Sequence, residues 1–312
     1  MQSPREVLTP DALALLQAVA QAGSFAAAAR ELGVVPSAVT YRIRQIEDAL
    51  DVLLFDRSSR QARLTEAGAE LLREGGRLLL EIDAVANRVK RVATGWESQL
   101  TIAVDTVISC STVMELAEAF FTLAPNTRLR LREESLSGTL EALTSGQADL
   151  ALGVVLDTGS SAGIQTSVLG DITFVYVVAP HHPLASVDGP LPDELVQKHR
   201  AIAAADSVQR GEALTRGLLA GQDVMTVTTM RAKLDAQLRG LGGGFVPEPM
   251  ARPYVESGRL VVKEIRRIAN RQVRLSYAWR SSPAPGRALQ WWLGQLESAA
   301  TRRALLQQHA RA

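Results

Sequence analysis

A chain of 312 residues with 34 basic and 33 acidic side chains has a formal net charge of +1 and one cysteine, Cys110. This length is too great for one compact core and suits two or three domains. The balanced charge argues against a strong non-specific nucleic-acid binder, so DNA affinity has to come from locally placed arginines. A single thiol excludes an intrachain disulfide, and the first residues lack a secretory signal, so we expect a cytoplasmic protein.

Near the N-terminus, two helix signals flank a tight turn. Thr9-Pro10-Asp11 predicts the start of a first helix. An alanine-rich helix then covers Phe25–Leu32 and ends at Gly33, and another helix opens at Pro36. The polar side of this last helix carries Ser37, Thr40, Tyr41, Arg42 and Arg44. A bracing helix followed by a helix with short polar and basic side chains is typical of a helix-turn-helix, although an ordinary helical hairpin has the same spacing.

A short hairpin and a long helix are predicted next. A wing is predicted from the apolar run 52–55, a polar turn at 56–60 and a returning strand at 61–64. Its Arg57 and Arg60 are placed to contact phosphates or a minor groove. From residue 65 to about residue 92, leucine, isoleucine and valine recur every three or four positions. This seam has no core of its own and predicts a dimer. We expect Gly75-Gly76 to weaken the helix and residues 93–97 to end it as a hinge.

From residue 100 the pattern changes to alternating strands and helices. The sequence predicts strands at 100–104, 128–132 and 150–155, with helices at 113–123 and 139–145 between them. This order predicts a parallel sheet in an α/β domain. Later segments continue this class of fold. We expect further strands at 172–179, 201–204, 260–262 and 273–279, and a sharp glycine entry at 242–247 into another short strand. Helices are expected at 211–219 and 233–241, with a closing helix at 289–305.

Several phrases together resemble the LysR-type transcriptional regulators over essentially the whole chain. They are GSFAAAARELGVVPSAVTYRIRQIEDALDVLLFDRSSRQARLTEAG at 23–68, GQADLALG at 146–153, VAPHHPL at 178–184 and GGGFVP at 242–247. The resemblance implies a winged helix-turn-helix domain at 1–66, a linker and dimerisation helix with a hinge at 67–95, and a two-lobed effector domain at 96–312. The latter is similar to periplasmic binding proteins, with lobe one at 96–170 and 269–312 and lobe two at 171–268.

The same resemblance implies a mode of action. Members form dimers that assemble to tetramers, bind an inverted repeat in promoter DNA, change its bending when a small-molecule effector enters the interlobe cleft, and can meet RNA polymerase. By position, Pro36, Ser37 and Thr40 are expected at base edges, and Tyr41, Arg42, Arg57 and Arg60 at phosphate or the groove under the wing. Many relatives have Ser-Arg where this chain has Thr40-Tyr41, which puts an arginine–phosphate contact at position 41 in doubt.

We expect the effector at the carboxyl ends of the parallel strands, where helix N-termini collect. The candidate residues are Asp105, Thr106, Leu136, Ser137, Val154, Ser207, Thr229, Phe245 and Val246. Asp105 has two interpretations. As a ligand-binding acid it would favour a hydroxyl donor or a cation, and as a helix cap it would leave the ligand's charge open.

Nothing in the sequence forms a catalytic constellation, and no cofactor or metal is expected. His181-His182 lacks further ligands, Cys110 lacks a paired histidine, and the glycines at 242–244 are not followed by Lys-Ser/Thr. Two alternatives stay open. A periplasmic solute-binding protein would share the two-lobed domain, although the missing signal peptide and the N-terminal helix-turn-helix argue against it, and a regulator could act without any effector.

Overall fold

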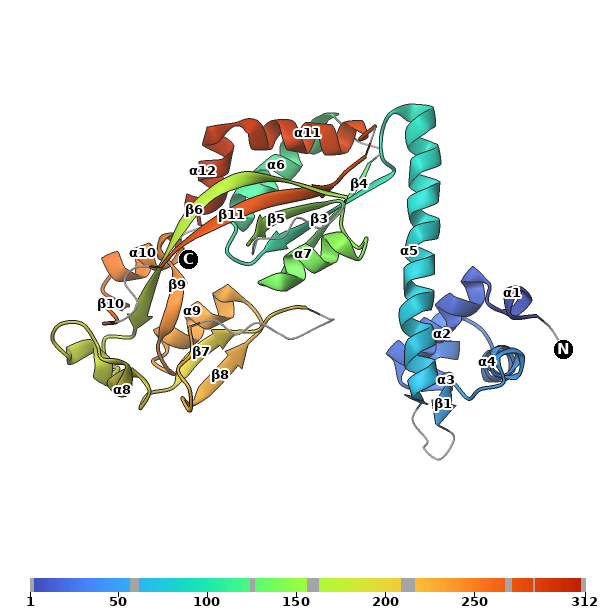
Figure 1. Ribbon diagram of the computed structural model, residues 1–312, viewed down its shortest axis with the longest axis horizontal. Coiled ribbons are helices and arrows are strands. Elements are labelled where there is room, and N and C mark those ends of the chain that lie inside the picture. Colours follow the sequence, from blue (N-terminus) through green and yellow to red (C-terminus); the bar gives the residue numbers. More distant parts are fainter. Residues whose placement is uncertain are drawn as a thin grey trace. The chain divides into compact units, whose positions relative to one another are not determined.

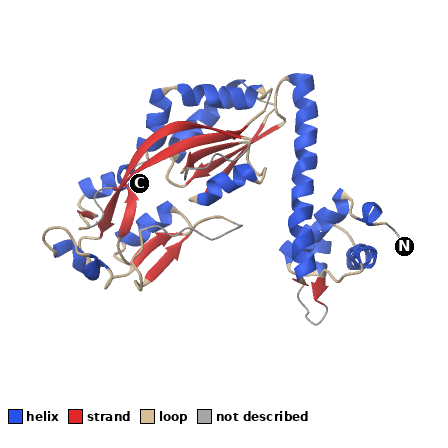
Figure 2. Cartoon of the chain, viewed as in Figure 1, coloured by secondary structure: helices blue, strands red, loops and turns tan. Residues whose placement is uncertain are grey.

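The structure, a computed structural model, describes residues 3–56, 62–123, 127–155, 163–208, 217–266, 271–282 and 284–309. The chain divides into two compact units, Met1–Val89 and Lys90–Ala312. Figures 1 and 2 show the small helical unit at the N-terminus and the larger unit of mixed helices and strands. The two units are described one at a time below.

The N-terminal unit begins with four helices: α1 (Pro4–Val7), α2 (Pro10–Ala22), α3 (Phe25–Leu32) and α4 (Pro36–Leu50). Side-chain oxygens of Thr9 and Ser24 cap α2 and α3, accepting backbone N–H bonds of 3.3 and 3.2 Å. Gly23 and Gly33 end these helices in the left-handed conformation, each with φ of 68°. The predicted bounds of the helix-turn-helix are therefore confirmed. Small alanines at positions 28 and 29 are fully buried, so α3 approaches α2 and α4 closely.

A minimal wing follows α4. Strands β1 (Phe55–Asp56) and β2 (Arg63–Leu64) pair antiparallel. The first strand is shorter than the predicted run 52–55 because the carboxylate of Glu47, only 5% exposed, takes the backbone donors of Leu54 and Phe55 at 2.8 and 3.4 Å. This contact fixes the entrance to the wing on α4. The turn at 57–61, with Arg57 and Arg60, lies outside the described residues.

Helix α5 (Glu66–Thr94) is 29 residues long. It runs two residues further than predicted, through the first two positions of the expected hinge, and Gly95 follows with φ of 75°. Gly75 is buried against α2, where a Cβ would lie 2.8 Å from a methyl group of Leu13. Close packing therefore explains this glycine better than a weakened helix does.

The larger unit is built on one curled mixed sheet with the strand order β10-β6-β11-β5-β3-β4, and β9 pairs with β6. Strands β3 (Gln99–Asp105), β4 (Arg128–Glu134) and β5 (Leu150–Val154) are parallel, as predicted. The strands β6 (Ile164–Val178), β9 (Gly244–Pro247), β10 (Val261–Lys263) and β11 (Arg271–Arg280) pair antiparallel with their neighbours, so the sheet is not wholly parallel. The long pair β6 and β11 runs from one lobe into the other (Figure 1).

Helices cover both faces of the sheet in lobe one. The face of Leu100, Ile102 and Leu152 packs against α6 (Cys110–Leu123) and α11 (Arg287–Glu297) around the fully buried Trp292. The other face presents small residues, including Ala103 and Ala151, to α7 (Ser137–Thr144). The alternation follows the two-residue period of a strand. It brings α7 close to the ends of β3 and β4.

Lobe two contains a parallel pair, β7 (Ala201–Ala204) and β8 (Val224–Val227), which joins β9 through a bridge between Ala201 and Gly243. Helix α9 (Met230–Leu238) packs on these strands, and the peripheral elements are α8 (Asp193–Val196), a 3-10 turn at Pro183–Ser186 and α10 (Glu248–Glu256). Figure 2 shows α9 beside the strands of this lobe. The lobe has a small core centred on Tyr176, Val178 and Leu191, whereas the buried residues Met230 and Leu234 of α9 belong to the main core that it shares with lobe one.

Three predicted segments need correction. The strand expected at 172–179 is the second half of β6, whose first half was missed because exposed Gln165 and Thr166 carry no apolar pattern. The closing helix is two helices, α11 and α12 (Ala299–Gln307), because Ser298 is extended and its side chain caps α12. Of the helix expected at 211–219, residues 217–219 are not helical and the rest lie outside the described residues.

Candidate functional sites

The exposed face of α4 gathers the predicted DNA-contacting residues. Val39, Ile43 and Ile46 bury one side of the helix. On the other side Pro36, Ser37, Tyr41 and Arg42 are exposed, and the Tyr41 side chain is 64% exposed. The Thr40 hydroxyl donates to the carbonyl of Pro36 at 3.0 Å, which leaves its methyl group and oxygen lone pairs for other contacts. The helix therefore presents short polar side chains and a cation on one surface, as groove reading requires.

Tyr41 has a local partner of its own. Gln45 Nε2 lies 3.2 Å from the tyrosine hydroxyl and donates to it. The hydroxyl proton is therefore free to point outward toward an acceptor such as a phosphate oxygen.

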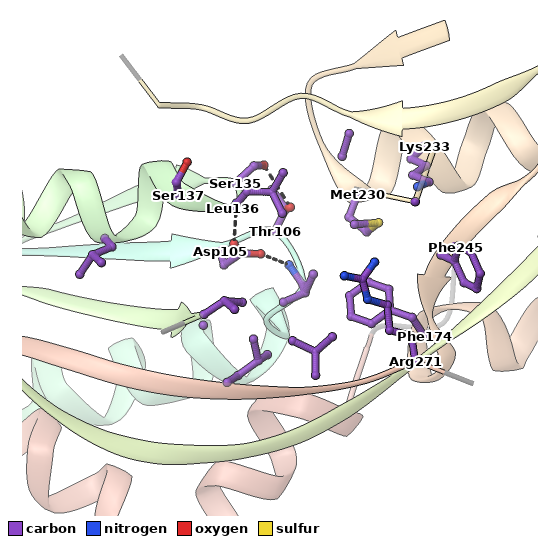
Figure 3. Close-up of a pocket in the computed structure, with 18 residues that line it drawn as sticks. Asp105, Thr106, Ser135, Leu136, Ser137, Phe174, Met230, Lys233, Phe245 and Arg271 are labelled. Carbon is purple, nitrogen blue, oxygen red and sulfur yellow. Dashed lines mark hydrogen bonds between the residues drawn. The ribbon is translucent and has the colours of Figure 1, made fainter. Parts of the chain in front are cut away.

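A cavity of about 250 Å³ lies between the two lobes of the larger unit. Figure 3 shows Asp105, Thr106, Ser135, Leu136 and Ser137 along one wall, with Met230, Lys233 and Phe245 on the facing wall. The remaining lining is mostly apolar. It comprises Val107, Leu140, Gly153, Val155, Phe174, Ala204, Gly217, Arg271, Val273 and Leu275. A concave, largely apolar space with a few polar groups is the usual form of a small-molecule site.

Asp105, at the end of β3, organises the lobe-one wall. It is 6% exposed, and its two oxygens accept from Val107 N at 3.0 Å, Leu136 N at 3.0 Å and Thr139 Oγ1 at 3.2 Å. Burial raises its pKa to about 7, and the nearby charge of Asp206 adds to this shift, while the three hydrogen bonds oppose it. These contacts tie β3 to the start of α7 and not to α6, the helix that follows β3, so Asp105 is a structural acceptor between two elements of lobe one.

The titration of Asp105 predicts a pH dependence. Its folded-state pKa, about 7, lies above the ordinary value of 3.8, so between these two pH values the folded state binds more protons than the unfolded state does. Stability therefore rises as pH falls through 7, by about 1 kcal/mol per pH unit from this group. We expect the urea-unfolding free energy of wild type relative to Asp105→Asn to increase from pH 8 to pH 5.5. A difference that stays flat across this range would contradict the assigned titration.

A set of hydrogen bonds, here called the interlobe latch, joins residues 134–138 of lobe one to residues 206–208 of lobe two. Ser207 Oγ donates to Glu134 Oε2 at 2.7 Å and accepts from Ser135 N at 2.8 Å. Ser207 N donates to Ser135 O at 3.3 Å. Asp206 accepts from the Ser137 hydroxyl and from Gly138 N, the latter at 3.2 Å. The carboxylate of Asp206 thereby occupies the N-terminus of α7.

The facing wall carries two cations. Lys233, on α9, is only 6% exposed, and burial lowers its pKa to about 8. Arg271 begins β11 directly opposite Phe174 of β6, and Figure 3 shows its guanidinium beside that ring. Within the described part of the chain, neither side chain has a hydrogen-bonding or ion-pair partner. The cavity is therefore positive on the wall opposite the latch.

The cavity brings together five of the nine predicted effector residues: Asp105, Thr106, Leu136, Ser137 and Phe245. The other four lie outside its lining. Val154 and Val246 are buried in strands, Ser207 is in the latch, and Thr229 caps α9 by accepting from Ala232 N at 3.1 Å. Sequence reasoning missed Lys233 and Arg271. Thr229 marked the right helix start, but nothing in the local pattern showed that the side chain four residues later would turn into the cavity.

A helix-turn-helix with a wing, followed by a two-lobed domain with an interlobe cavity, defines the class of ligand-responsive DNA-binding regulators. The model of the bacterial regulatory helix-turn-helix protein, lysR family, matches residues 10–69, and that of the LysR substrate binding domain matches residues 93–301. The chain belongs to the LysR family of transcriptional regulators.

Individual relatives span almost the whole chain. The probable HTH-type transcriptional regulator YhaJ of Escherichia coli (strain K12) is 37% identical, covering 93% of this chain and 96% of its own length. The uncharacterized HTH-type transcriptional regulator YeeY of the same strain is 34% identical, covering 92% of each chain. Among solved structures, full-length LysG from Corynebacterium glutamicum with bound effector Arg is 25% identical with a TM-score of 0.50, covering 96% of this chain and 98% of that one.

Two further findings concern other functional classes. In the described ranges, no helix is both long and apolar enough to cross a membrane. Nor does any group of three or more His, Cys, Asp or Glu side chains there have the arrangement of a metal site. His182 has a structural contact instead, because its Nδ1 accepts from Leu184 N at 3.2 Å.

Proposed function

We propose that this LysR-family regulator binds an inverted repeat in promoter DNA through α4 and the wing, and that a small molecule in the interlobe cavity changes how it bends that DNA. The observation that carries the proposal is the cavity itself, which is lined from both lobes and bordered by the latch. A ligand that contacts both lobes differs in affinity between lobe arrangements, and only such a ligand can shift their equilibrium. Because its target is promoter DNA, the proposal places the protein in the cytoplasm.

On DNA, the proposal assigns two kinds of contact. Pro36, Ser37 and Thr40 stand at the start of α4, the end that a recognition helix directs at base edges. Tyr41 and Arg42, together with Arg57 and Arg60 of the wing, supply phosphate or minor-groove contacts. Phosphate contacts add affinity for any sequence, whereas base-edge contacts discriminate between sequences.

Substitutions on α4 are expected to separate these contacts. Ser37→Ala and Thr40→Ala should weaken binding to the selected inverted repeat by about 1–3 kcal/mol per site and leave binding to unrelated DNA nearly unchanged. Arg42→Ala should weaken both and flatten the salt dependence. Fluorescence anisotropy over a range of salt concentrations measures this, with DNA selected from a random pool by the purified protein.

The matched control is Gln17→Ala, which removes an exposed neutral side chain from α2. It should bind both DNAs as wild type does. An equal loss on both DNAs from Thr40→Ala would refute the assignment of Thr40 to base reading.

The proposed assembly is a dimer through α5, and two dimers form a tetramer on DNA, where contact with RNA polymerase follows. Exposed apolar residues along α5 support the dimer. They are Leu78, Ile82, Val85, Val89 and Val92. LysG, whose structure carries an effector, supports effector binding as the function of the larger unit, and no catalytic function or cofactor is proposed.

The effector is what separates this proposal from a regulator whose cavity is unused. Footprinting of the full-length protein on its selected repeat, with and without a saturating ligand, tests it. A change in footprint length or bend angle is expected. A ligand that saturates the cavity and leaves both unchanged would favour the regulator that acts without an effector.

A further inference from the structure

The N-terminus of α7, which faces the cavity, already has its anion. Helix N-termini attract negative groups through their free N–H donors. Here Leu136 N donates to Asp105 Oδ2 at 3.0 Å, and Gly138 N donates to Asp206 Oδ1 at 3.2 Å. The Ser137 hydroxyl also donates to Asp206. An acidic ligand would find these donors occupied and two carboxylates beside them.

Among the described residues, the cations on the opposite wall have no such partners. Lys233 lies alongside β9, where a Cβ built on Gly244 would be 3.2 Å from the lysine Cε, and the ammonium group has no acceptor or acidic partner among the described residues. A buried cation without a partner is unfavourable, and a bound anion would relieve this cost. Arg271, on β11, places a second cation on the border of the same cavity, and it too has no partner in the described ranges.

The rest of the cavity sets the size and polarity of its occupant. Apolar side chains surround the space next to the two cations: Phe174, Met230, Phe245, Val273 and Leu275. The volume of about 250 Å³ exceeds the roughly 150 Å³ cavity that holds benzene in an engineered protein. The cavity therefore has room for a single ring, or an aliphatic body of similar size, with one charged group.

We infer that the effector is a small organic acid with a compact apolar body, whose acid group binds Lys233, with Arg271 as the second cation. This rests on the proposed function, in which the interlobe cavity is the effector site. The anion is held by lobe two and by β11, while lobe one contributes Thr106, Ser135 and Ser137 as neutral polar contacts. The ligand's charge and its uncharged groups thus face different lobes.

Isothermal titration calorimetry of the full-length protein tests the ligand class. The probes are benzoate, cyclohexanecarboxylate and hexanoate, each compared with its own amide, together with benzylamine as a cation of similar shape. At least one acid should bind more tightly than its amide and than benzylamine. Lys233→Met should weaken that acid by about 10- to 100-fold, as expected for the loss of a charge-assisted hydrogen bond, and Arg271→Met by less.

The control is Lys198→Met, which makes the same substitution at an exposed lysine and should leave acid binding unchanged. Melting of the unliganded protein separates a binding role from a structural one. Lys233→Met should melt no lower than wild type, because the cation removed has no partner in the described chain. A large drop in melting temperature would assign Lys233 to the fold instead and overturn the inference.

Other outcomes also decide the matter. The inference fails if no acid binds, if amides or benzylamine bind as tightly as the acids, or if Lys233→Met retains full acid affinity. Footprinting with the bound acid then tests the proposed function independently. If an acid binds in a Lys233-dependent way and the footprint does not change, the inferred ligand class is supported and the proposed regulation is refuted. If a neutral probe changes the footprint, the proposed regulation is supported and the inferred ligand class is refuted.

Discussion

Ile82→Glu is expected to convert the full-length protein to monomers and to lower its affinity for the selected repeat by at least about 100-fold. The exposed apolar residues of α5 stand at 78, 82, 85, 89 and 92, a spacing of four and three that matches the a and d positions of a heptad. Their side chains are between 46% and 87% exposed in the single chain. A partner helix is the simplest way to cover such a stripe.

The size of the effect follows from symmetry. In a parallel or antiparallel pair the substitution is present in both chains. In each chain it removes a buried isoleucine and places a carboxylate in the seam, which destabilises the dimer by about 2–3 kcal/mol or more per chain. A monomer also loses the second half-site, which a dimer binds at high effective concentration. Sedimentation velocity at micromolar concentration gives the assembly, and anisotropy gives the affinity.

Ala84→Glu is the control, because it adds the same charge to α5 at a position outside the heptad stripe. It should remain assembled and bind DNA. If Ile82→Glu sediments like wild type, the seam does not hold the assembly together.

The sequence predicted the N-terminal unit well because its determinants are local. Thr9 and Ser24 cap the helices that follow them, and Gly33 supplies the left-handed residue that the turn needs. The apolar period of α4 matches its buried face. One prediction in this unit failed because of a side chain outside the wing. Glu47 accepts hydrogen bonds from two backbone N–H groups of the apolar run that was predicted to be a strand.

From the sequence, only some of the residues that border the cavity could be predicted. Strand ends and helix starts indicated Asp105, Thr106, Leu136 and Ser137, which line the cavity because the topology of parallel strands brings those positions together. The latch and the cations depend on which residues meet across the two lobes. Ser207 was expected to contact ligand, yet it bonds to Glu134 and Ser135, which are 73 and 72 residues away in sequence. No local pattern contains that information.

Gly138→Ala is expected to open the interlobe latch. Gly138 lies in the first turn of α7, and a Cβ built on it would overlap Ser207 Oγ and lie 2.9 Å from the Ser207 carbonyl carbon. The added methyl group therefore cannot fit while residues 206–208 keep their place. The 3.2 Å bond from Gly138 N to Asp206 and the 2.8 Å bond from Ser135 N to Ser207 should be lost together.

Because lobes one and two share the cavity, the loss should appear in binding as well as in stability. We expect the free energy of unfolding to fall by about 1–3 kcal/mol, and the affinity for a cavity ligand to fall by about 10-fold or more. Ser207→Ala removes hydrogen bonds without adding a clash and should show a smaller loss of both. In the double variant, the missing hydroxyl relieves the main overlap, so part of the loss should be recovered.

Gly294→Ala provides the control for the helix effect of alanine. Gly294 lies inside α11, and a Cβ there would meet nothing within 4 Å, so alanine should stabilise the protein by up to about 1 kcal/mol. Urea unfolding, calorimetry with the bound ligand and footprinting of all four variants complete the comparison. If Gly138→Ala loses stability but keeps wild-type ligand affinity and the same footprint response, then the latch is a packing contact within one domain and plays no part in how the lobes respond to ligand.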